Sequence, residues 1–187
     1  MGVPRVFELA PEAVVAAEAK MKLAQAGREC GECTACCTVS AVYELNKPIG
    51  ERCCHLAERC TIYETRPLSC RAFACNWLLR REPAQADDLR PDRLGLMFTT
   101  MATRLGGVLV AWEVWPDARS HERCQQLLAE LLQRKAVIAL VALAPPGAPS
   151  GGLELRAAPH VSPADLKDLA AAILELQAPA AAEASAP

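Results

Sequence analysis

Apolar and polar residues recur along the chain with two different periods, and each period predicts one kind of element. Between Pro11 and Gly27, residues such as Val14, Ala17 and Met21 recur at helical spacing, while charged residues occupy other positions. Proline suits the first turn of a helix, and glycine suits its end. The pattern therefore predicts an amphipathic helix over residues 11–27, which leads the chain to its first cysteine.

The pattern after residue 93 predicts a small sheet with a helix inserted into it. Two runs of strand-like residues, Leu94–Met101 and Val108–Trp115, are joined by a short segment that contains two glycines, which predicts a β-hairpin. A helical stripe follows over Ser120–Arg134, and Val137–Leu143 is apolar enough for a buried strand. We expect this third strand to join the sheet of the hairpin.

The C-terminal part predicts one more strand and one more helix. Leu153–Arg156 is expected to be a short edge strand, and Ser162 followed by a proline is typical of a helix start. Residues 178–187 contain only alanine, proline, glutamate and serine, so they are predicted to be a disordered tail. The apolar residues that share one face of the predicted helix are Leu166, Leu169, Ala170 and Ile173.

Residues 30–81 differ from the rest of the chain, because they show little secondary-structure periodicity. Such a segment is expected where bonds to a metal replace a hydrophobic core. We therefore predict an α+β fold in which a cysteine-rich, loop-dominated metal module packs on a small helix-flanked antiparallel sheet. Residues 1–177 are expected to form a single domain, with the α+β part over residues 94–177.

Ten cysteines are present, and nine of them lie between Cys30 and Cys75. The first run, Cys30-Gly-Glu-Cys33-Thr-Ala-Cys36-Cys37, has two-residue spacings, which let one tight loop direct several thiolates at a common point. The tenth cysteine, Cys124, falls on the apolar stripe of its predicted helix and is expected in the core. The eight candidate metal ligands are Cys30, Cys33, Cys36, Cys37, Cys54, Cys60, Cys70 and Cys75.

The N-terminal region helps to decide between metal binding and disulfides, the two uses of such a cluster. Residues 7–27 carry acidic and basic side chains, so they lack the uninterrupted apolar core of a signal peptide. No window approaches the roughly 20 uncharged apolar residues of a membrane span. We therefore expect a cytoplasmic protein whose thiols are reduced and bind metal.

Eight thiols can serve metals in more than one way. Two zinc sites of four cysteines each, one such site beside an iron–sulfur cluster, and a partly filled chelating pocket all satisfy the count. Adjacent side chains point apart in most backbone conformations, so we expect Cys36 and Cys37 to serve different centres. A bacterial ferredoxin is disfavoured because Ser40 occupies the position of the fourth cysteine in that pattern.

These segments resemble a known family. The matching stretches are Cys30–Cys37, Cys54-His-Leu56 and Cys60-Thr-Ile-Tyr-Glu-Thr-Arg-Pro-Leu-Ser-Cys70-Arg-Ala-Phe-Ala-Cys75. They are similar to the YkgJ-type cysteine-cluster family, also called the CxxCxxCC family of zinc- or iron-chelating domains. The resemblance covers residues 30–79 and implies that the eight cysteines are the metal-binding set, without implying a biological task. Flagellin lysine methylases have a related cysteine region, but we find no glycine-rich nucleotide loop after a strand, so methyl transfer is not expected.

Several residues outside the set of eight are candidates for other roles at the metal. Cys53 is an alternative ligand to Cys54, although we expect it to be an exposed or supporting thiol. His55 is the best candidate among other ligand types, although a neighbouring position is expected for it. Arg66 and Arg71 are expected to donate to the thiolates and offset their charge. The alternative is that these arginines hold an anionic substrate or partner near the metal.

Charge and motif content limit the classes of function. The net charge is −2 and the isoelectric point is near 6.0, so there is no global attraction to nucleic acid or to an acidic membrane. No catalytic constellation is recognised, which argues against an enzyme. Three classes remain: a metal-binding protein that coordinates zinc or iron, an iron–sulfur protein with a redox or protein-modification role, and a cytosolic thiol redox sensor. The expected partner is a metal ion, and the sequence identifies no protein partner.

Overall fold

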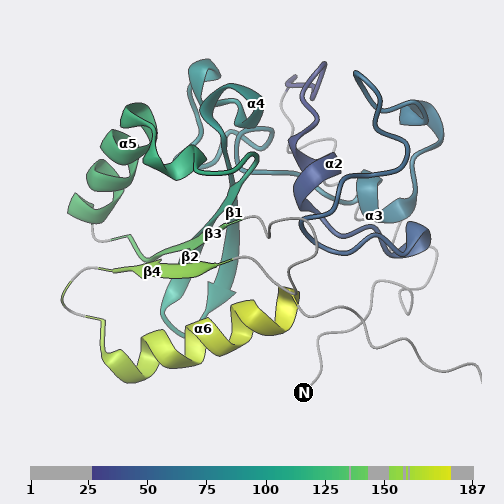
Figure 1. Ribbon diagram of the computed structural model, residues 1–187. Coiled ribbons are helices and arrows are strands. Elements are labelled where there is room, and N and C mark those ends of the chain that lie inside the picture. The colour runs from purple at the N-terminus through teal and green to yellow at the C-terminus, as the bar shows by residue number, and fades with distance from the viewer. Residues whose placement is uncertain (1–26, 135, 143–151, 158, 160, 178–187) are drawn as a thin grey trace, which may run out of the picture.

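A four-stranded sheet lies at the centre of the structure, a computed structural model that describes residues 27–134, 136–142, 152–157, 159 and 161–177 (Figure 1). The α+β class is confirmed. The helix predicted over residues 11–27 and the tail predicted over residues 178–187 fall outside the described residues, apart from Gly27. Within the described part of the chain, every helix is too short or too polar to cross a membrane.

The sheet is mixed, with the strand order β1-β2-β3-β4. Strands β1 (Leu96–Thr103) and β2 (Gly106–Glu113) form the predicted hairpin, and β4 (Leu153–Arg156) pairs with β3 (Ile138–Val141) as the predicted edge strand. The expectation of a wholly antiparallel sheet was wrong, because β2 and β3 are parallel. A helix between these two strands returns the chain to the end where β2 began, which is the connection that parallel strands require.

Helices cover both faces of the sheet, as Figure 1 shows for α5 (Glu122–Gln133) and α6 (Pro163–Gln177). Alternate residues of a strand point to opposite faces, so Phe98 packs in the cluster that contains the α5 residues, and Met97 packs in the cluster that contains the α6 residues. Cys124 of α5 is fully buried, and its thiol donates a hydrogen bond to the Leu94 carbonyl over 3.1 Å. The prediction that Cys124 belongs to the core is confirmed.

The cysteine segment lies beside the sheet and is built from short elements joined by loops (Figure 1). Each of its helices has five residues or fewer, in agreement with the weak periodicity of the sequence. The segment is packed against the core in part through α2, whose Ala35 and Val39 are buried in the same cluster as Met97. Its elements, and those that follow before the sheet, are α2 (Ala35–Val39), η2 (Tyr43–Leu45), η3 (Tyr63–Thr65), α3 (Leu68–Arg71), η4 (Asp87–Leu89) and α4 (Pro91–Leu94).

Two buried polar residues tie the ends of the cysteine segment to the rest of the fold. Arg28, just before the first cysteine, donates to the Trp77 carbonyl over 2.7 Å and pairs with Asp87 over 2.7 Å. Its guanidinium also lies 4.6 Å from the centre of the Trp77 ring. Asn76, just after the last cysteine of the segment, donates its backbone N–H to the Phe98 carbonyl of β1 over 2.8 Å. Both ends of the segment are therefore fixed.

Candidate metal centre

The loops of the cysteine segment enclose a cavity of about 1120 Å³. Four separate stretches of the chain contribute cysteines to its wall, so residues far apart in sequence are brought together. Each of these stretches is short and is held by local hydrogen bonds, which makes the arrangement a property of the folded segment. The cysteines that line the cavity are Cys30, Cys33, Cys36, Cys37, Cys53, Cys60 and Cys70.

Local backbone structure explains how the first four thiols reach the cavity. The two-residue spacing from Cys30 to Cys33 forms a tight turn, in which the Cys33 N–H donates to the Cys30 carbonyl over 2.9 Å. Gly31 has a φ of +54° in this turn, a conformation that favours glycine. Cys36 and Cys37 then lie on α2, and the Cys37 N–H donates to the Thr34 carbonyl over 2.9 Å.

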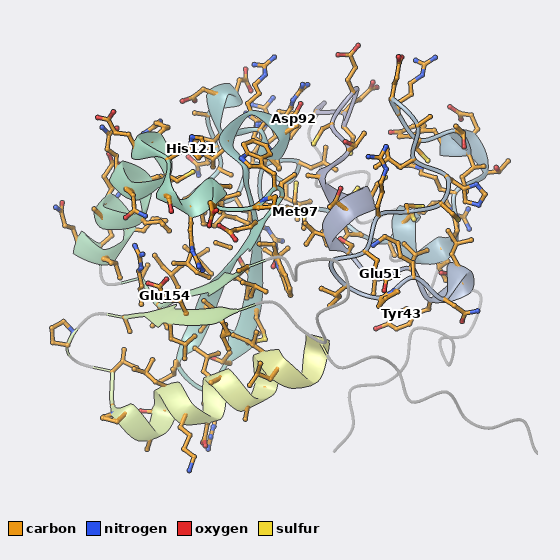
Figure 2. The ribbon with its side chains drawn as sticks, viewed as in Figure 1. Tyr43, Glu51, Asp92, Met97, His121 and Glu154 are labelled. Atoms are coloured by element: carbon orange, nitrogen blue, oxygen red, sulfur yellow. The ribbon has the colours of Figure 1, made fainter. Side chains whose placement is uncertain are left out.

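The second half of the segment is positioned by similar local contacts. Pro67 precedes α3, and its carbonyl accepts the N–H of Cys70 over 3.0 Å. The bridge between Leu56 and Cys60 closes a small loop that ends at Cys60. Asp92 of α4 is labelled in Figure 2, and its backbone N–H donates a hydrogen bond to the Cys33 sulfur, which links the cavity wall to the helix that precedes β1.

Cys37 is the most acidic thiol of the group. A hydrogen bond from the Cys36 thiol is the largest cause that lowers the pKa of Cys37 to about 7. Burial opposes this effect, whereas the positive charges of Lys47 and Arg66 and a hydrogen bond from Cys60 add to it. The same contact with Cys37, together with burial, raises the pKa of Cys36 well above its ordinary value. Cys36 therefore keeps its proton and donates a hydrogen bond to Cys37.

Four further thiols hold their protons more tightly than free cysteine does. Burial is the main cause that raises the pKa of Cys30, Cys33 and Cys75, and it raises the pKa of Cys70 to about 11. These thiols are neutral at physiological pH when no metal is bound. A metal that binds here must displace their protons.

The structure places Cys53 and Cys54 differently from the sequence interpretation. Cys53 was expected to be exposed or supporting, but it is only 7% exposed, lines the cavity, and donates its backbone N–H to the Cys37 carbonyl over 2.9 Å. Cys54 was placed among the ligands, but its side chain is exposed and is not part of the cavity wall. A turn begins at this pair, in which the Leu56 N–H donates to the Cys53 carbonyl over 3.1 Å, and of the two residues only Cys53 lines the cavity.

The remaining predicted residues divide into those near the cavity and those away from it. Cys75 is not among the residues that line the cavity, but it lies close enough to Cys30 that its charge raises the pKa of the Cys30 thiol. Arg66 lines the cavity, and its charge partly offsets the effect of burial on the pKa of Cys30. Arg71 is exposed and does not line the cavity, and neither does His55.

Sequence reasoning missed Lys47. This lysine is only 7% exposed, and its ammonium group donates to the carbonyls of Ser40, Pro48 (3.2 Å) and Thr38 (3.5 Å). Its charge also acts on Cys37 and Cys53, so it braces the loop after α2 and offsets thiolate charge. The sequence contained one weak indication, an excess of basic over acidic residues from Lys47 to Arg81.

The thiols lie around one cavity, but they do not surround a common position at which a metal ion could bind. Among the described residues, no three histidine, cysteine or carboxylate side chains converge closely enough to hold one metal ion. The seven lining cysteines share one cavity, and Cys36 and Cys37 contact each other there, so the expected division into two sets stays a prediction. The donor chemistry suits a thiophilic metal, because all ten cysteines are free thiols.

Comparison with known proteins adds no assignment. No family model matches the chain, and no curated protein and no solved structure was found to be similar to it. The interpretation therefore depends on the residues and their arrangement.

Proposed function

We propose that this protein binds zinc or iron through cysteine thiolates at the cavity of the cysteine segment. The observation that carries the proposal is that cysteines from four stretches of the chain line one cavity. Eight ligands are proposed, with Cys53 in the place that the sequence pattern gave to Cys54. The proposed ligands are Cys30, Cys33, Cys36, Cys37, Cys53, Cys60, Cys70 and Cys75. The resemblance to the CxxCxxCC family, which is itself a proposal, agrees with this chemistry.

The charges around the cavity favour a cation. Three carboxylates line it, those of Glu29, Glu58 and Glu64, against the two guanidinium groups of Arg59 and Arg66. Thiolates would add further negative charge as they lose their protons. Soft sulfur ligands select zinc and iron over magnesium and calcium, which prefer oxygen.

Different residues would have different roles in binding the metal. The thiols supply the ligands, and each one that binds gives up a proton to solvent. Lys47 and Arg66 offset the negative charge that remains, and Lys47 also holds the loop after α2 in place. A bound metal would supply the cross-link that draws the thiols together, since structural zinc contributes about 10–16 kcal/mol in small zinc-dependent peptides.

A second candidate function is a thiol redox sensor. The observation that favours it is the acidic Cys37, which accepts hydrogen bonds from both Cys36 and Cys60. A low-pKa thiol next to another thiol is typical of cysteines that form reversible disulfides. A sensor would gain a disulfide under mild oxidation without needing bound metal.

Elemental analysis of protein purified without oxygen tests the proposal. We expect zinc or iron in the purified chain, with two metal centres if eight thiolates are used. Zinc protein is colourless, whereas an iron–sulfur protein is brown, so absorption spectra separate the two metals. Cys33→Ser and Cys70→Ser should lower the metal content, and Cys124→Ser, a change in the core away from the cavity, should leave it unchanged. Full metal content in both ligand variants would overturn the proposal.

A further inference from the structure

The cavity is larger than metal binding alone requires. A zinc ion held by four sulfurs at about 2.3 Å fills a small part of a space of about 1120 Å³. Pockets that hold small organic ligands measure about 300–1,000 Å³, so this cavity can accommodate a small molecule in addition to metal. The chemistry of that molecule has to be inferred from the polar groups on the wall.

Arg66 is the polar group on the wall that is best prepared for a ligand. Its Nε donates to the Tyr63 carbonyl over 2.8 Å, and its guanidinium lies 3.6 Å from the centre of the Tyr63 ring. These two contacts fix the plane of the guanidinium and use only one of its three nitrogens. Among the described residues, its two terminal nitrogens have no hydrogen-bond or ion-pair partner.

Two other arginines near the cysteine segment show what a structural arginine looks like in this fold. Arg28 donates to three carbonyls and pairs with Asp87. Arg90 makes a two-pronged pair with Asp92, with distances of 2.6 and 2.7 Å. Both arginines use their terminal guanidinium nitrogens to bind protein groups, whereas Arg66, which lines the cavity, leaves its terminal nitrogens unused by any described residue. A planar fork of this kind matches the two oxygens of a carboxylate or a phosphate.

We propose that the cavity takes a small oxyanion compound, a carboxylate or a phosphate, which Arg66 binds through its terminal nitrogens beside the metal. The inference rests on the proposed metal function. The three carboxylates of the wall oppose an anion, so binding of the oxyanion is expected to depend on the Arg66 guanidinium.

Calorimetric titration of the metal-loaded protein with malonate, and separately with inorganic phosphate, tests the inference. The two titrations distinguish a carboxylate ligand from a phosphate ligand. We expect at least one of them to bind to wild type, and we expect Arg66→Ala to weaken that binding at least tenfold. Arg66→Lys keeps the positive charge but loses the fork, so its affinity should fall to an intermediate value. Arg71→Ala removes the same charge from an exposed position outside the cavity wall and should bind like wild type.

Metal content measured on every sample separates this inference from the proposed function. Wild-type protein without metal would overturn both. Metal-loaded wild type that binds neither anion, or an Arg66→Lys variant with unchanged affinity, would overturn the oxyanion site alone. Loss of metal from Arg66→Ala and Arg66→Lys, with anion affinity unchanged per bound metal, would instead assign Arg66 to metal retention.

Discussion

The neighbouring pair Cys53 and Cys54 gives the sharpest test of the candidate metal centre. The two residues have the same side chain and differ by one position, but Cys53 lines the cavity while Cys54 is exposed. Replacing each by serine in turn compares a thiol inside the wall with one outside it. We expect Cys53→Ser to weaken metal binding and Cys54→Ser to leave it close to wild type.

The size of the effect follows from the share of one ligand in the site. If a structural zinc site contributes about 10–16 kcal/mol through four thiolates, one thiolate accounts for about 2.5–4 kcal/mol. This corresponds to a loss of about 60-fold to about 700-fold in affinity. The backbone hydrogen bond from Cys53 to the Cys37 carbonyl survives the change, because it does not involve the side chain. The metal-free protein should therefore lose only about 1 kcal/mol of stability.

Competition with a chromophoric zinc chelator under anaerobic conditions measures both affinities. Circular dichroism of each variant shows whether the fold is retained. Equal affinities for the two variants would mean that neither thiol is a ligand. A large loss in Cys54→Ser with no loss in Cys53→Ser would show that the loop turns the other way and would refute the reasoning from burial.

Two further predictions concern the groups around the thiols. Metal affinity should fall as the pH falls, by about tenfold per pH unit for each proton released, because burial raises the pKa of thiols such as Cys30 and raises that of Cys70 to about 11. Calorimetry in buffers of different ionisation enthalpy counts these protons. In the metal-free protein, burial raises the pKa of these thiols above 9, the ordinary value for cysteine. The stability that this shift contributes is present below pH 9 and is lost as the pH rises toward the folded-state pKa values. Denaturation by urea at pH 7 and at pH 10.5 measures the loss. Lys47→Met should cost about 2–4 kcal/mol in the same assay by leaving buried carbonyls unpaired, whereas Lys167→Met, on the exposed side of α6, should cost less than about 0.5 kcal/mol.

The elements of the sheet could be predicted from sequence, but their directions could not. Alternation along β1 and the stripe of α5 reflect which side chains are buried, and burial is what a sequence pattern records. The direction of a strand depends on the end of the sheet to which the preceding connection brings the chain. The spacing of apolar residues in the sequence does not encode that path. One indication was available, since all four residues of β3 are apolar, and a strand buried on both faces is typical of parallel pairing.

The same limit applies at the candidate site. Spacing identified which stretch holds the thiols, but it could not decide between Cys53 and Cys54, because that choice depends on how the backbone pairs with Cys37. Lys47 resembles a surface lysine in the sequence, and only the path of the loop after α2 buries it. Arg66 and Arg71 look equivalent in the motif, yet α3 leaves Arg71 exposed while Arg66 faces the cavity.

The anchoring of the cysteine segment at both ends has a consequence for metal exchange. Arg28 and Asn76 hold the chain on either side of the thiols without using any thiol themselves. If metal leaves, the freed cysteines remain tethered within a small volume and keep a high effective concentration for one another. Recapture then requires only the short loops to close again, and the sheet need not unfold. A segment held in this way can give up and regain metal as a local event.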